Sequence, residues 1–66
     1  MNIFEYAMKM EKDGEEYYRQ LAQQTTNKGL QTILTMLADE EVKHYNAISA
    51  IKNIPEIIER TFKHLR

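Results

Sequence analysis

The chain has 66 residues, enough for one small domain, and carries a net charge of −1 from 9 basic and 10 acidic residues. The two signs are mixed along the chain, so no basic surface for nucleic acid or anionic membrane is expected. The absence of cysteine excludes disulfides, thiol catalysis and thiolate metal sites. A domain of this size buries only about 60% of the surface that its unfolded chain exposes. Stability is therefore expected to come from a metal, from self-association, or from both.

The N-terminal segment does not resemble a secretion signal. An acidic residue, Glu5, lies where a signal peptide has its basic region and apolar run. No apolar stretch approaches the ~20 residues that a membrane-spanning helix requires. A cytoplasmic protein is the expectation.

A first helix is predicted from about residue 3 to residue 25. Asn2 is a favourable N-cap, and Glu5 follows three residues later, as in a capping box. From there one seam recurs at alternating spacings of three and four, the pattern of a heptad repeat. Its residues are Phe4, Ala7, Glu11, Gly14, Tyr18, Leu21 and Thr25.

A second helix is predicted over residues 28–52, after a turn signal at residues 25–29 that contains several N-cap residues and a glycine. Helices joined by so short a turn must be antiparallel neighbours. The second seam has the same alternating spacing as the first. Its residues are Leu30, Ile33 or Leu34, Leu37, Glu41, His44, Ile48 and Ile51.

A third, short helix is predicted over residues 55–65, because proline is tolerated in the first turn of a helix and not in its interior. Pro55 therefore marks a new start, and Ile57, Ile58, Phe62 and Leu65 form an apolar face. This helix could cap its own hairpin or build a larger ring. No alternation typical of strands occurs, so the predicted fold class is all-α: an antiparallel helical hairpin plus a short third helix.

Three ionisable residues interrupt the apolar seams: Glu11 in the first helix, and Glu41 and His44 in the second. Buried carboxylates are normally paired or bind a metal. Counted from the centre of the turn, Glu11 and Glu41 each lie about 15 residues away and His44 about 17 or 18. At ~1.5 Å rise per residue all three reach one level, roughly 22–27 Å from the turn. The count predicts that the three side chains meet on the inner face of the hairpin.

The residues around this level favour a metal site. Glu41 and His44 have the i, i+3 spacing that directs two ligands to one point. Ala7 and Gly14 are small, and a helical glycine costs ~1 kcal/mol relative to alanine, so a close approach is expected at Gly14. A second copy would supply four carboxylates and two histidines within four helices, which is the di-iron or di-manganese pattern. Oxygen-rich ligands with one imidazole per metal favour iron or manganese over zinc.

On these residues the sequence resembles the ferritin-like superfamily, and most closely its rubrerythrin branch, over roughly residues 3–50. The resemblance is carried by Glu11, Gly14, Tyr18 and the segment 37–44, which ends in Glu41-x-x-His44. Most relatives have two such hairpins, so the resemblance implies a homodimer that forms one four-helix bundle. It is similar to half-length ferritin-like proteins, some of which are found inside encapsulin shells; the 66 residues could also be the first half of a longer chain.

The resemblance also implies roles and an activity. Glu11 would be a terminal ligand, Glu41 a bridging ligand, and His44 would bind one metal, with two iron ions per dimer or manganese in their place. The implied function is oxidation of ferrous iron by O₂ or peroxide, as in a ferroxidase or a rubrerythrin-like peroxidase. The cysteine-built rubredoxin domain of rubrerythrins is missing, so redox cycling would need an external electron donor. Tyr18 would be either a hydrogen-bond donor beside the ligands or a core aromatic residue.

The same residues allow other interpretations. The chain could be a non-enzymatic dimerisation or scaffold module, with a structural or vestigial metal site. The three ionisable residues could be a polar cluster that sets helix register without metal, or could hold a single ion such as zinc. Assembly could extend beyond the dimer. Surface positions are expected for Glu15, Glu16, Glu40 and His64.

Overall fold

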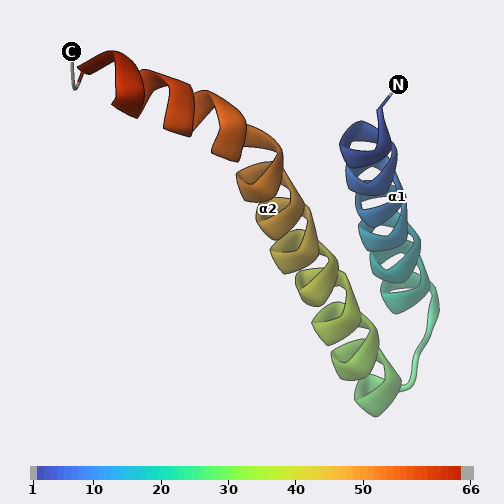
Figure 1. Ribbon diagram of the computed structural model, residues 1–66. Helices are drawn as coiled ribbons and strands as arrows, with labels where there is room; N and C mark the ends of the chain where they lie inside the picture. Colours follow the sequence, from blue (N-terminus) through green and yellow to red (C-terminus); the bar gives the residue numbers. More distant parts are fainter. Residues whose placement is uncertain (1, 65–66) are drawn as a thin grey trace.

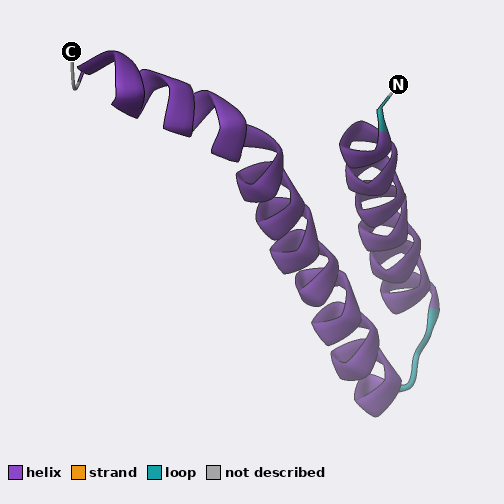
Figure 2. Ribbon diagram, viewed as in Figure 1, coloured by secondary structure: helices purple, strands orange, loops and turns teal. Residues whose placement is uncertain are grey.

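The computed structural model describes residues 2–64 and contains two helices, α1 (Ile3–Gln24) and α2 (Lys28–His64). The helices run antiparallel, side by side, and the connection between them is short (Figure 1). No strand occurs within residues 2–64 (Figure 2). The predicted all-α hairpin is confirmed.

α1 begins at a side-chain cap. The Glu5 backbone N–H donates to Asn2 Oδ1 at 2.8 Å, as the capping-box pattern predicts. The Glu5 carboxylate does not return to Asn2; it lies 3.5 Å from Lys52 Nζ, across the hairpin. At the other end, the Thr25 N–H donates to the Leu21 carbonyl at 3.1 Å. The cap and this last hydrogen bond place the ends of α1 within one residue of the prediction.

The turn is closed by side chains and not by a glycine. Asn27 Oδ1 accepts from the Leu30 N–H at 2.9 Å and so caps the start of α2. The Asn27 N–H donates to Thr25 Oγ1 at 3.2 Å, and Gln31 Nε2 donates to the Thr25 carbonyl at 2.8 Å. Gly29 lies inside the first turn of α2, without a positive φ.

The predicted break before Pro55 is wrong: α2 continues through this proline as one helix to His64. The predicted third helix over residues 55–65 is therefore the end of α2, and Leu65 lies outside the described residues. A proline inside a helix removes one hydrogen bond and clashes with the carbonyl four residues earlier, which a bend relieves without ending the helix. Figure 1 shows α2 bending away from α1 as its colour turns to orange.

α2 extends well beyond α1, since the two helices have 37 and 22 residues. At ~1.5 Å per residue, α2 is about 55 Å long and α1 about 33 Å. The contact between Glu5 and Lys52 marks the end of the paired region, and the rest of α2 projects from it (Figure 1). This overhang, residues 53–64, does not cap its own hairpin. Its exposed apolar residues are Ile54, Ile57, Ile58 and Phe62.

The hairpin is too thin to enclose a core. Within residues 2–64 only Leu34, 8% exposed, and Ala38, fully buried, count as buried. Leu37, which the predicted seam places inside, is 40% exposed, so Ala38 and not Leu37 faces α1. The seam prediction is wrong at Leu37, and also at Leu30 and Ile51, which are 45% and 53% exposed. Two neighbouring rows of α2 fit the same three–four spacing, and periodicity does not say which of them faces α1.

Most of the exposed apolar side chains outside the overhang lie on one surface, which we term the apolar face. Arg19 Nη2 donates to Asp39 Oδ1 at 3.1 Å, so this ion pair marks one edge of the hairpin. Tyr17 lies two residues before Arg19, and Leu37 lies two residues before Asp39. Each residue turns the helix by about 100°, so both side chains point about 200° away from the ion pair, to the opposite edge of the hairpin. The residues of the apolar face are Ile3, Tyr6, Met10 and Tyr17 from α1, and Leu30, Ile33, Leu37 and Ile51 from α2.

No helix within residues 2–64 combines the length and hydrophobicity of a membrane span.

Candidate metal centre

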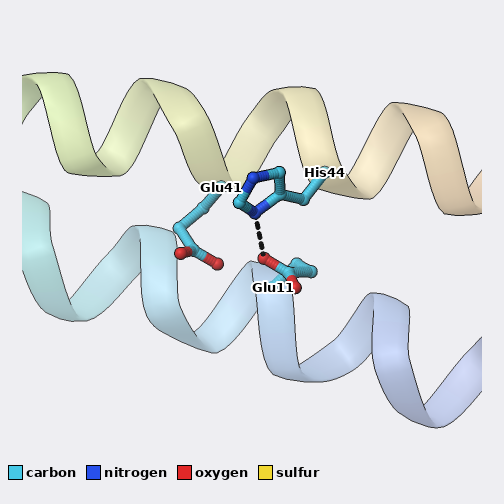
Figure 3. A group of neighbouring side chains, drawn as sticks. All are labelled: Glu11, Glu41 and His44. Atoms are coloured by element: carbon cyan, nitrogen blue, oxygen red, sulfur yellow. Dashed lines mark hydrogen bonds and ion pairs between the residues drawn. The ribbon is translucent and has the colours of Figure 1, made fainter.

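Glu11, Glu41 and His44 converge between the two helices. One potential ligand atom from each lies within 4.8 Å of the others. Figure 3 shows Glu41 and His44 reaching from α2 and Glu11 from α1. The equal distances from the turn, counted in residues, account for this convergence, because both helices rise by the same amount per residue.

The imidazole of His44 faces Glu11 through its Nδ1 atom. A hydrogen bond joins His44 Nδ1 and Glu11 Oε2 at 3.2 Å, the dashed line of Figure 3. The Glu11 side chain is 24% exposed and that of His44 is 54% exposed. The cluster is thus held inside the hairpin on the carboxylate side and opens to solvent at the imidazole.

The two carboxyl groups interact directly, and their pKa values diverge. A hydrogen bond with Glu41, followed by the contact with His44, lowers the pKa of Glu11. The same bond with Glu11, together with partial burial and charge repulsion, raises the pKa of Glu41. Glu41 therefore keeps its proton to a higher pH than Glu11. Two carboxyls in contact share a proton because both cannot ionise freely at this separation.

No lysine or arginine within the described residues forms an ion pair with Glu11 or Glu41. The nearby basic side chains have other contacts: Lys9 with Asp13, Lys43 with Glu40, Lys52 with Glu5, and Lys12 over the Tyr45 ring at 5.3 Å. The negative charge of the two carboxylates is therefore balanced only by a proton, or by an ion that binds between them. This is the expected chemistry of a cation site.

Gly14 provides the space in which Glu41 lies. A Cβ atom built on Gly14 would lie 3.0 Å from Glu41 Oε2 and 3.2 Å from Glu41 Cδ. The close approach predicted for Gly14 is confirmed, and the group that approaches is the carboxylate from the opposite helix. The donor set of two carboxylates and one imidazole, with this space around it, fits iron or manganese.

Tyr18 is not brought to the cluster within one hairpin. It lies seven residues after Glu11, about 10.5 Å further along α1. Its ring packs edge-on against Tyr17, with centroids 5.8 Å apart. Within residues 2–64 no hydrogen bond joins Tyr18 to any of the three side chains. In this hairpin Tyr18 is a half-buried packing residue.

Two interhelical ion pairs that flank the cluster were not singled out from the sequence. Lys52 contacts Glu5 at 3.5 Å on one side, and Arg19 contacts Asp39 at 3.1 Å on the other. Arg19 also pairs with Glu15 at 2.8 Å, and Glu15 is half-buried. The prediction that Glu15 is a solvated surface carboxylate is therefore wrong. Charged pairs between helices depend on how each helix is rotated about its axis, which sequence spacing alone does not specify. Glu16, Glu40 and His64 are exposed, as predicted.

His44 lies at the centre of the apolar face. It is seven residues from Leu37 and seven from Ile51, so the three share one row of α2. Large apolar side chains therefore surround the open side of the cluster. A surface of this kind is typical of a protein interface.

Comparison with known proteins gives one result. A family model described as Rubrerythrin matches residues 2–63, which is all of α1 and all of α2 except its last residue. Searches of curated proteins and of solved structures found no significant match.

Proposed function

The chain belongs to the rubrerythrin family, and on that premise we propose that two copies pair through their apolar faces and bind two iron ions between them. The paired protein oxidises ferrous iron with O₂ or hydrogen peroxide, as a ferroxidase or a rubrerythrin-like peroxidase.

The position of His44 in the middle of the apolar face carries this proposal. One hairpin supplies two carboxylates and one imidazole, which leave much of the coordination sphere of an iron ion to other ligands. A two-fold partner that covers the face brings the same three groups to the same level. The result is a cluster of four carboxylates and two histidines inside four helices, the arrangement of di-iron carboxylate proteins.

The exposed apolar area supports the same pairing. Completing the burial of one large apolar side chain contributes on the order of 1 kcal/mol when it is already half covered. Eight such residues lie on the apolar face of each copy. The hairpin by itself buries only Leu34 and Ala38, so a second copy would also supply the core that the single chain lacks.

The three side chains of the cluster would have different roles as ligands. His44 Nδ1 and Glu11 Oε2, already 3.2 Å apart, would hold one ion together, and each copy would provide one such pair. Glu41 would act as the bridging ligand and would have to release its proton to bind. When bound, two ferrous ions supply the two electrons that, with two protons, reduce one hydrogen peroxide molecule to two waters. These 66 residues contain no cysteine and so hold no thiolate iron site; the electrons for another cycle would come from a donor outside them.

A non-enzymatic dimerisation module is the second candidate, and the hydrogen bonding within the cluster favours it in one respect. The three side chains satisfy one another, and no buried side-chain nitrogen or oxygen within residues 2–64 lacks a hydrogen-bond partner. In this case the cluster would set the register of four helices, with or without a structural ion.

An anaerobic titration with ferrous iron separates the two candidates. The proposal requires about one iron per chain in a dimer, and a ferric absorption band in the near ultraviolet after air or peroxide is added. Parallel titrations with manganese and zinc identify the preferred metal. The double variant E11A/E41A should remain a helical dimer without binding or oxidising iron. An intact wild-type dimer that binds no iron would leave only the register function.

A further inference from the structure

We infer that Gly14 is a positioning residue for the metal centre: because it has no Cβ, the carboxylate of Glu41 can lie directly against the backbone of α1, at the level of Glu11 and His44. This inference rests on the proposed function, since it concerns how the same carboxylate is presented to iron. It explains why a residue unfavourable in helices stands in the middle of α1.

The contact is specific in its geometry. A Cβ on Gly14 would lie 3.0 Å from Glu41 Oε2, 3.2 Å from Cδ and 3.5 Å from Cγ. Ordinary van der Waals contact of a Cβ atom begins at 3.4 Å, so the Oε2 atom would have to retreat by about 0.4 Å, the difference between 3.4 and 3.0. These atoms are the flexible end of a half-exposed side chain. The carboxylate would therefore move, while the helices stay in place.

A displacement of this size matters for a metal ligand. Ligand distances in metal sites hold to within about 0.2 Å. Substitution of groups that orient a ligand typically lowers metal affinity 10–100-fold. The variant G14A, which keeps all three ligands, should therefore bind ferrous iron about 10–100-fold more weakly than wild type.

The same substitution should have the opposite effect on the metal-free fold. Alanine is the most favourable helix residue and glycine among the least favourable. Gly14 lies well inside α1, so metal-free G14A should melt no lower than wild type, and its melting temperature should rise if the carboxylate moves freely. Weaker binding in a more stable protein is a combination that general damage to the fold does not produce.

Gly29 provides a matched control. It is the other glycine of the chain and is also helical, in the first turn of α2, at the far end of the hairpin from the cluster. A Cβ there would lie 3.4 Å from Asn27 Oδ1, an ordinary contact. G29A therefore makes the same chemical change in a helix without touching Glu41.

A shorter carboxylate tests the contact itself. E41D withdraws the carboxylate from Gly14 by one methylene, so a Cβ at position 14 should no longer displace it. The loss of affinity caused by G14A should therefore be smaller in the E41D background than in the wild-type background. Unequal losses in a double-mutant cycle are the signature of two residues in contact.

The experiment compares wild type, G14A, G29A, E41D and G14A/E41D as full-length chains. Anaerobic titration with ferrous iron gives affinity and stoichiometry, and circular dichroism gives the melting temperature of the metal-free protein. The inference expects weaker binding only in variants that disturb the carboxylate, and no loss of melting temperature in G14A.

Three results would overturn the inference while leaving the proposed function intact: G14A binds iron as tightly as wild type, its loss is equal in both Glu41 backgrounds, or metal-free G14A melts far below G29A. The last would mean that the added Cβ disturbs helix packing. Wild type that binds no iron would instead overturn the proposed function, and the inference with it.

Discussion

Replacing Leu37 by aspartate tests whether the apolar face joins two copies. Leu37 is 40% exposed in the single hairpin and lies seven residues before His44, so a partner that completes the cluster must cover it. Burying a leucine fully contributes about 1.5–3 kcal/mol, so covering the remaining 40% contributes about 0.6–1.2 kcal/mol in each copy.

Aspartate removes this contribution and adds a larger penalty. Leaving a carboxylate unpaired in the interface costs about 2 kcal/mol. Together with about 1 kcal/mol of lost burial, each copy loses about 3 kcal/mol and a symmetric dimer about 6 kcal/mol. Since each 1.4 kcal/mol changes an equilibrium tenfold, the dissociation constant should rise by roughly 10⁴. Iron binding should fall with it, because each separated copy keeps only three ligands.

Analytical ultracentrifugation, with iron counted per chain, measures both effects. Thr32→Asp is the matched control: it adds the same charge at an exposed position seven residues before Asp39, on the edge opposite the apolar face. The control should remain a dimer with about one iron per chain. If L37D sediments as the wild-type dimer and binds iron equally well, the apolar face is not the interface and the two-fold arrangement is wrong.

Three further predictions concern pH, metal removal and the turn. Iron affinity should fall as the pH drops, because protons compete with the metal for the ligand atoms. In the metal-free protein the Glu41 carboxyl, followed by its carbon-13 chemical shift, should titrate above its ordinary pKa of 4.5, and a midpoint at or below that value would contradict the pairing with Glu11. Iron at 100 times its dissociation constant should stabilise the fold by about 2.7 kcal/mol. For a chain of this size, this stabilisation raises the melting temperature by roughly 10 °C or more, and a chelator should reverse the rise. A melting temperature that iron does not change would show that no metal binds the folded state. Asn27→Ala should lower the stability by about 1 kcal/mol, because the Leu30 N–H loses its acceptor; an unchanged melting temperature would mean that the turn does not depend on this cap.

Features that depend on local chemistry were predictable from the sequence. Asn2 and Asn27 are capping residues whose hydrogen bonds reach only three positions along the chain. The short turn forces the helices to be antiparallel, and equal residue counts on both sides then bring Glu11, Glu41 and His44 to one level. None of these inferences requires knowledge of how one helix is rotated against the other.

Pro55 shows where local chemistry misleads. The rule that proline ends a helix reflects one lost hydrogen bond and one steric clash. The structure absorbs both in a bend, and the helix resumes with its own hydrogen bonds and with ion pairs such as Glu56 with Arg60, at 2.7 Å. The sequence indicates the lost hydrogen bond and the clash at Pro55, but it does not indicate that a bend of the helix relieves them.

The sequence by itself determined the two helices, their antiparallel pairing and the level at which three ligand-type residues meet. Only the tertiary structure decided the rotation of α2. Two neighbouring rows of α2 repeat every seven residues: one contains Leu34 and Glu41, with Ala38 between them, and the other contains Leu37, His44 and Ile51. Contacts with α1 select the first row to face inward. That choice leaves the second row on the apolar face, and it places the carboxylate of Glu41 against Gly14. Rotation about a helix axis depends on which side chains pack across the interface, and periodicity within one helix does not contain that information.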